Sequence, residues 1–263
     1  MKLAYTTLGC PDWNLDQIIQ NTKEYGFDGI DFRGYLKDLE ITWTPEFSSQ
    51  AAETAKRIAD AGLEVPCFST GISVNGGEKK QRDNLVEIQR YAKLCPIFGT
   101  SFLRVFGQGD ASPREQAVDN FITNIQPLLK VAGEYGVVIL LETHDTWTES
   151  GRINEVMQRV NSPSLRVLWD IHHPWKVSNE TLNYTWDTLG KWVSYTHWKD
   201  ATAEDKLCLM GKGILPLKEW YRLLKSKGYN GYCTLEWEKR WHREMEEPEI
   251  GFPDFVRYMK SLE

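Results

Sequence analysis

Eight short runs of β-branched, aromatic and aliphatic residues recur along this chain, separated by stretches with apolar residues at helical spacing. The runs cover residues 3–8, 29–33, 64–69, 101–106, 137–142, 166–170, 193–198 and 232–236. Helical spacing is clearest in Val118, Phe121, Ile122, Ile125, Leu128, Leu129 and Ala132. Parallel strands need crossovers of about a dozen residues or more, and every connection here is long enough to hold one. The alternation therefore predicts a parallel α/β fold.

Eight strands are the number that closes a (β/α)8 TIM barrel, and 263 residues is near the usual length of such a barrel. We predict one domain over residues 1–263. An open doubly wound sheet is the structural alternative, because periodicity alone does not exclude it. The GxGxxG fingerprint that would favour a dinucleotide-binding sheet is missing. The glycine pairs Gly107/Gly109 and Gly211/Gly213 are too short for it and are interpreted as loop glycines.

Composition favours an enzyme that acts on a small ligand. The net charge of −6 requires no broad basic face, so we expect neither a nucleic acid nor a membrane partner. No apolar run approaches the length of a transmembrane helix, and the N-terminal residues lack the apolar stretch of a signal peptide. The five cysteines show no CxxC spacing, which does not suggest a disulfide framework. A cytoplasmic location is the resulting expectation.

Three of the last four predicted strands end in a carboxylate: Glu142 in VVILLE, Asp170 in RVLWD and Glu236 in CTLE. The remaining strand reaches His197 in VSYTHW. Any one of these side chains alone would be typical of a solvated strand end. In a barrel, however, the C-terminal strand ends converge on the active site, so we expect the four to meet. Burying three carboxylates together is costly unless a cation neutralises them, which predicts a divalent metal site.

The identity of the metal is constrained by the ligand types. Three carboxylates and one imidazole form a hard, oxygen-rich set, which favours Mn²⁺, Mg²⁺ or Co²⁺ over a structural zinc ion. Zn²⁺ in an open catalytic site remains an alternative. Thiolate ligands are not expected, because only Cys67 lies near any predicted strand end.

The stretch LETHDTWTESGRINEVMQRVNSPSLRVLWDIHHPW resembles the central block of the sugar phosphate isomerase/epimerase family, the xylose isomerase-like barrels. Its features are a glutamate ending the fifth strand (Glu142) and an aspartate followed three positions later by histidine (Asp170 and His173). The segment HWKD (residues 197–200), the glycines 211 and 213 and the closing Glu236 also match the pattern. The N-terminal GFDGIDFRG resembles the second strand of the family.

The resemblance implies a mechanism. Similar ketose epimerases hold a carbonyl and its neighbouring hydroxyl on the metal, and two metal-binding glutamates exchange a proton with the substrate carbon through an enediolate. By matching position these are Glu142 and Glu236, and His173 would donate a hydrogen bond to the same oxygen. The resemblance thus implies a sugar or sugar derivative as substrate. Related barrels often pair, which leaves a homo-oligomer open.

Further side chains near the strand ends are candidates for substrate binding. They are His144, His172, Lys199, Arg104 and Trp175, although any of the charged ones could instead pair with a nearby carboxylate. We expect Trp147, Trp175 and Trp241 in loops beyond strand ends, where they are candidates for stacking on a sugar. Strand alternation points Trp169 and Trp198 away from the barrel axis, so we expect these two in the core.

Other functions remain open at this point. Inosose dehydratases resemble this pattern and begin with the same proton abstraction, so a lyase is the main alternative. An apurinic endonuclease shares the barrel but needs a multi-zinc cluster with histidines from earlier strands, and no histidine precedes His144. A non-catalytic sugar-binding protein predicts a damaged ligand set, whereas all four ligands are present.

Overall fold

The structure, a computed structural model, describes residues 1–108 and 112–263. Its main sheet has the strand order β2-β1-β10-β7-β6-β5-β4-β3. The strands are β1 Lys2–Thr6, β2 Gly29–Asp31, β3 Cys67–Ser73, β4 Phe102–Phe106, β5 Val138–Glu142, β6 Leu165–Asp170, β7 Val193–Trp198 and β10 Tyr232–Leu235. Parallel ladders with helices between the strands form the predicted (β/α)8 barrel. A parallel bridge from Gly29 to Glu64 joins β2 to the residues before β3.

Strands β1 and β2 each end two residues before the predicted end, and the largest differences from the prediction lie at β3 and after β7. The third strand begins at Cys67 instead of residue 64 and continues to Ser73, because Pro66 has no amide proton with which to extend the ladder. A short antiparallel ribbon after β7, formed by β8 Asp200–Ala201 and β9 Leu207–Cys208, was not predicted. Gly109, interpreted as a loop glycine, lies outside the described residues.

Helices occupy the connections between the strands. They are α1 Leu15–Tyr25, α2 Ala51–Asp60, α3 Glu78–Phe98, α4 Arg114–Glu134, α5 Ser150–Val160, α6 His172–Lys176, α7 Leu182–Leu189, α8 Leu217–Ser226 and α9 Pro248–Lys260. Short 3₁₀ turns lie at Thr7–Gly9, Ile41–Trp43 and Pro45–Phe47. The local sequence explains where helix α1 begins and ends. Asn14 and Gln17 form a capping box at its start, and Gly26 ends it at φ 84°. Among the helices of the described ranges, none combines the length and apolarity needed to cross a membrane.

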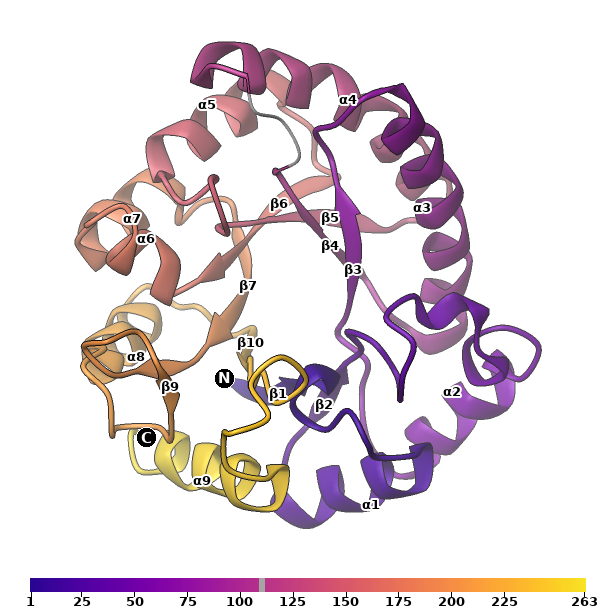
Figure 1. Cartoon of the computed structure of the whole chain (residues 1–263), viewed down its shortest axis with the longest axis vertical. Coiled ribbons are helices and arrows are strands. Elements are labelled where there is room, and N and C mark those ends of the chain that lie inside the picture. Colours follow the sequence, from indigo (N-terminus) through magenta and orange to yellow (C-terminus); the bar gives the residue numbers. More distant parts are fainter. Residues whose placement is uncertain (109–111) are drawn as a thin grey trace. The chain divides into compact units, whose positions relative to one another are not determined.

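The chain divides into two compact units, Met1–Pro66 with Thr196–Glu263, and Cys67–Tyr195. The core of the first unit contains an aromatic cluster. Tyr5 lies 4.9 Å from Phe27 and 4.2 Å from Phe252, measured between ring centroids. Helices α1 and α9, which supply much of this core, lie side by side although they come from opposite ends of the chain (Figure 1).

In the second unit, helices α3, α4 and α5 lie along the outside of strands β3 to β6 (Figure 1). The predicted apolar stripe of α4 is buried, except that Ile122 is only half-buried. Phe121 from this stripe packs against Trp147, with ring centroids 5.0 Å apart. The periodicity read from the sequence therefore identifies the face of α4 that packs on the sheet.

Candidate metal and active site

Glu142 and Asp170 are the last residues of the adjacent strands β5 and β6 in the second unit, and neither side chain is exposed to solvent. Arg104 on the neighbouring strand β4 is buried as well, and its Nε lies 3.3 Å from Glu142 Oε2. An ionised carboxylate removed from water needs opposite charge or hydrogen-bond donors close by. The arginine predicted as a substrate ligand therefore contacts one of the predicted proton carriers.

Asp170 is held by the start of helix α6. Its Oδ1 accepts hydrogen bonds from the backbone amides of His172 at 2.8 Å and His173 at 3.4 Å. The Nε2 of His173 lies 3.6 Å from Asp170 Oδ2. Thr143 fixes the backbone, because its hydroxyl accepts from the Asp170 amide at 2.9 Å. These bonds orient Asp170, and the ligand atoms of Asp170, His172 and His173 lie close enough together to hold a metal ion.

Two predicted residues of the second unit contact the Phe106 ring, and a third contacts one of these two. The Arg104 guanidinium lies 3.9 Å from the Phe106 ring centroid, and the His144 ring lies 4.9 Å from it. The rings of His144 and His173 are 4.4 Å apart. Trp175 lies on α6 together with His173, not in a loop as predicted, and is half-buried. The structure thus brings the predicted histidines and arginine of this unit together.

His197 is the central residue of the corresponding cluster in the first unit. It lies on β7 with no exposed surface, and both of its ring nitrogens face carboxylates. Its Nδ1 is 3.4 Å from Glu236 Oε1, and its Nε2 is 3.5 Å from Asp31 Oδ2. Glu236 itself directly follows β10 and is 4% exposed.

Asp31 was not among the predicted site residues, although it is completely buried at the end of β2. Like Glu142 and Asp170, it is a carboxylate that ends an observed strand. The strand-end rule missed it because the predicted second strand, in GFDGIDFRG, continued to residue 33. A carboxylate on the far nitrogen of a ligating histidine is a common way to fix the ring orientation and tautomer.

Lys199 pairs with carboxylates. Of the two roles considered for it, substrate binding and pairing with a nearby carboxylate, this is the second. Its Nζ donates to Glu236 Oε2 at 2.6 Å and to Glu238 Oε1 at 3.3 Å, and its side chain is 3% exposed. Because the opposite charge is so close and so well buried, this ammonium holds the Glu236 carboxylate in one orientation.

Asp200, the last residue of the HWKD segment, contacts the later glycine pair Gly211/Gly213. This contact gives a physical reason why the two motifs occur together. Its buried carboxylate accepts hydrogen bonds from four backbone amides, those of Ala201, Gly211, Gly213 and Leu215, at 2.8–3.3 Å. A side chain at Gly213 would collide with this carboxylate. The loop after β7 is therefore wrapped around Asp200, directly beyond His197 and Lys199.

The predictions for the tryptophans are confirmed for two residues and wrong for a third. Trp169 and Trp198 are 1% and 0% exposed, which confirms their place in the core. Trp147 is also buried, at 2% exposed, so the prediction that it stacks on a sugar is wrong. It packs against Phe121 and against Gly107, which has no Cβ to exclude it. Trp241 is 51% exposed and stays available.

The thiols give no support to thiolate ligation. Burial raises the pKa of the Cys233 thiol to about 12. Burial, with the Asp200 and Glu246 carboxylates nearby, raises the pKa of the Cys208 thiol to about 11. Both thiols are therefore protonated at neutral pH.

Comparison with known proteins decides the family. A family model described as a xylose isomerase-like TIM barrel matches residues 19–262. The chain belongs to this family. Among curated proteins it is similar to fructoselysine 3-epimerase of Escherichia coli O157:H7, with 24% identity over 253 residues that cover 90% of each chain.

Solved structures share the fold. The probable 3-DHS dehydratase AsbF of Bacillus anthracis superposes with a TM-score of 0.84 at 18% identity, covering 99% of both chains. The IolI protein, solved with a bound zinc atom, has a TM-score of 0.80 at 17% identity, covering 98% of this chain and 97% of its own. A protein of this fold can thus bind a metal, and the buried carboxylates and imidazoles here are suitable ligands.

Replacing Asp200 tests the role of the amide cluster. Asp200→Ala leaves four amides, two of them in buried hydrogen bonds, without their acceptor, so we expect the free energy of unfolding to fall by about 3 kcal/mol. Urea denaturation followed by circular dichroism measures this. The control Asp187→Ala, at an exposed position on α7, should change stability by no more than about 0.5 kcal/mol. Equal effects of the two substitutions would contradict the assignment.

Proposed function

We propose that this protein is a divalent-metal-dependent sugar epimerase or isomerase that acts on a ketose or a related polyol-ketone. The main support is that four buried potential metal ligands lie at or next to the ends of four strands that are consecutive in the sheet order, β5, β6, β7 and β10. Similarity to fructoselysine 3-epimerase supports a sugar derivative as substrate.

The proposed ligands are Glu142 and Asp170 from the second unit and His197 and Glu236 from the first. Carboxylate and imidazole donors fit Mn²⁺, Mg²⁺, Co²⁺ or, in an open site, Zn²⁺. Their complete or nearly complete burial supports this set, because concentrated buried negative charge calls for a cation. We further propose that His197 binds through Nδ1 while its Nε2–H donates to Asp31, an arrangement compatible with the 3.5 Å separation from that carboxylate.

The proposed reaction exchanges a proton on the carbon next to a carbonyl. Such a proton is very weakly acidic, and a bound divalent ion would supply Lewis-acid stabilisation of the developing oxyanion. Glu142 and Glu236 take and return the proton from opposite sides of the carbon. Each is held by a buried cation of its own unit, Arg104 at 3.3 Å and Lys199 at 2.6 Å, which keeps the carboxylate oriented.

Neighbouring residues are assigned to substrate binding. His173, fixed beside Asp170, would donate a hydrogen bond to the substrate oxygen on which negative charge develops. We assign the binding of substrate hydroxyl groups to His144, which contacts the His173 ring, and to His172 and Trp175 on α6. Arg104 is better placed to orient Glu142 than to bind substrate.

A dehydratase is the second candidate, favoured by the structural similarity to AsbF. Both reactions begin with removal of a proton next to a carbonyl, and they differ in whether a hydroxyl group then leaves. The product distinguishes them. An endonuclease or a non-catalytic sugar-binding role has less support, since no histidine precedes His144 and all four proposed ligands are present.

Solvent exchange tests the proposed chemistry. Purified protein incubated with ketoses, inososes and 2-keto acids in deuterated water should incorporate deuterium next to the carbonyl, as followed by proton NMR. EDTA should abolish the exchange, and added Mn²⁺, Mg²⁺, Co²⁺ or Zn²⁺ should restore it. An epimeric or isomeric product identifies the proposed activity, whereas an unsaturated ketone identifies the dehydratase. Exchange that is unaffected by EDTA would contradict the metal-dependent mechanism.

The two glutamates can be tested as proton carriers. Glu142→Gln and Glu236→Gln should each reduce kcat by about 100- to 10,000-fold, because the amide cannot accept the proton. Metal content, measured by mass spectrometry, separates loss of the base from loss of the ion. Glu219→Gln, at an exposed position on α8, serves as the control and should retain its rate. A near-normal rate in either active-site variant would show that its glutamate is not a proton carrier.

Asp31 can be tested through metal affinity. If it orients His197, Asp31→Asn should weaken metal binding by about 10- to 100-fold. Competition with a chelating dye measures this affinity without requiring turnover. Asp28→Asn, which alters a carboxylate before β2 that accepts from the Leu3 amide, is the control. An unchanged affinity in Asp31→Asn would refute the orienting role.

A further inference from the structure

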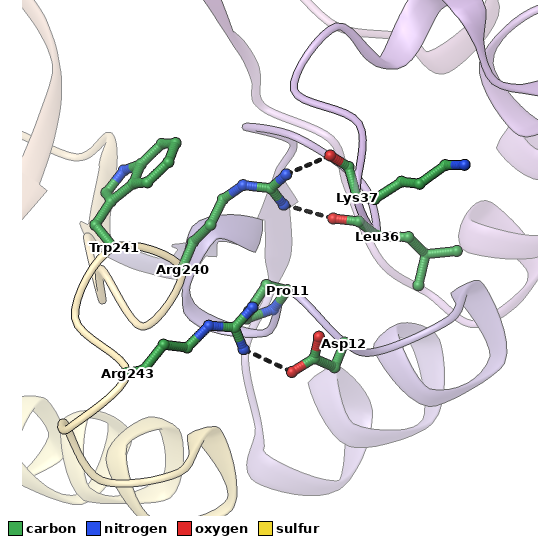
Figure 2. A pocket seen from close by; sticks show the side chains of 7 residues that line it. All are labelled: Pro11, Asp12, Leu36, Lys37, Arg240, Trp241 and Arg243. Carbon is green, nitrogen blue, oxygen red and sulfur yellow. Dashed lines mark hydrogen bonds and ion pairs between the residues drawn. The ribbon is translucent and has the colours of Figure 1, made fainter.

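A cavity of about 430 Å³ lies entirely within the first unit, among the loops that follow β1, β2 and β10 (Figure 2). Its lining residues are Pro11, Asp12, Leu36, Lys37, Arg240, Trp241 and Arg243. In a barrel of this kind, the loops beyond the C-terminal strand ends bind the substrate. Trp241 lies only five positions beyond Glu236. The cavity therefore belongs to the face of this unit that carries Glu236.

The lining is positively charged in a chain whose net charge is −6. Two guanidinium groups and one ammonium group accompany a single carboxylate, Asp12. The Lys37 side chain points away from Arg240 in Figure 2, so the two arginines supply the charge inside the cavity. Burial, followed by repulsion from Arg243, lowers the pKa of Arg240. An anion placed between the guanidinium groups would relieve that repulsion.

The two arginines differ in their available donors. Arg240 donates through both terminal nitrogens to the backbone carbonyls of Leu36 and Lys37, and so ties the loop after β10 to the loop after β2. Arg243 uses one terminal nitrogen, at 2.8 Å from Asp12 Oδ2. Its side chain is 58% exposed and that of Asp12 is 78% exposed, so this ion pair adds little stability. Arg243 thus keeps most of its donors for a ligand.

Trp241 supplies an apolar wall beside these charges. Its side chain is half-exposed, and the Arg240 guanidinium lies 5.7 Å from its ring centroid. A half-exposed aromatic ring beside cations suits a ligand with both an apolar or sugar-like part and a charged group.

We propose that this cavity binds an oxyanion, a carboxylate or a phosphate, carried by the substrate at the end remote from the reacting carbon. The inference rests on the proposed function and narrows its substrate class to anionic sugar derivatives. Arg243 is the main ligand, Arg240 maintains the cavity by fixing the loop after β2, and Asp12 competes with the anion for Arg243.

The role of Asp12 provides a discriminating test. If the Arg243–Asp12 pair only fastens two loops, Arg243→Gln and Asp12→Asn break the same contact and should act in the same direction. If the cavity binds an anion, they should act in opposite directions. Arg243→Gln removes a donor, whereas Asp12→Asn removes a competing negative charge.

The measurement compares KM values for deuterium exchange with fructoselysine, which carries a carboxylate, with a ketose phosphate and with neutral fructose. Arg243→Gln should raise the KM for a charged substrate, divided by the KM for fructose, by about 10-fold. This is the change in affinity expected from the loss of one charge-assisted hydrogen bond. Asp12→Asn should lower the same ratio. Comparing the two charged substrates identifies the oxyanion. Arg257→Gln, an exposed arginine on α9, should leave the ratio unchanged.

Phosphorus NMR titration with inorganic phosphate separates failure of this inference from failure of the proposed function, because it needs no turnover. Weaker phosphate binding in Arg243→Gln and tighter binding in Asp12→Asn would support the anion site even if no ketose exchanges its proton. The inference is overturned if both substitutions change the KM ratio, or phosphate binding, in the same direction or not at all.

Discussion

Burial of carboxylates is the constraint on which the rest of this structure depends. The described residues place five aspartate and glutamate side chains, Asp31, Glu142, Asp170, Asp200 and Glu236, almost completely out of water. Each would be costly without positive charge or donors around it. Cations from neighbouring strands lie beside two of them, a histidine ring lies beside Asp31, and backbone amides surround Asp170 and Asp200.

This requirement is met in part within each compact unit. In the second unit, Arg104 faces Glu142 and the first turn of α6 faces Asp170. In the first unit, Lys199 and His197 face Glu236. Each unit thus contains one of the two proposed proton carriers and an oriented cation that holds it. Such partners fix the direction of a carboxylate before any substrate arrives, which is the preorganisation that proton transfer requires.

The fold could be predicted from sequence because barrel strands are short and apolar and their connecting helices carry a clear stripe. Strand boundaries were less accurate where local chemistry intervened, as at Pro66, which delays the start of β3. The strand-end rule identified Glu142 and Asp170 but missed Asp31, because β2 ends at Asp31 whereas the predicted strand continued to residue 33. The burial of Trp147 depends on Gly107 and Phe121, which are distant in sequence. The pairing of Arg243 with Asp12 was equally invisible, because these loop residues are separated by 231 positions.

Asp200 organises the loop that follows β7 through backbone amides alone. Any residue other than proline supplies such an amide, so the path of this loop places few demands on the exposed side chains of Ala203, Glu204 and Lys206. Those side chains could be exchanged while the Asp200 carboxylate preserves the path of the backbone. The segment beside His197 and Lys199 is therefore well suited to changing specificity without loss of the scaffold.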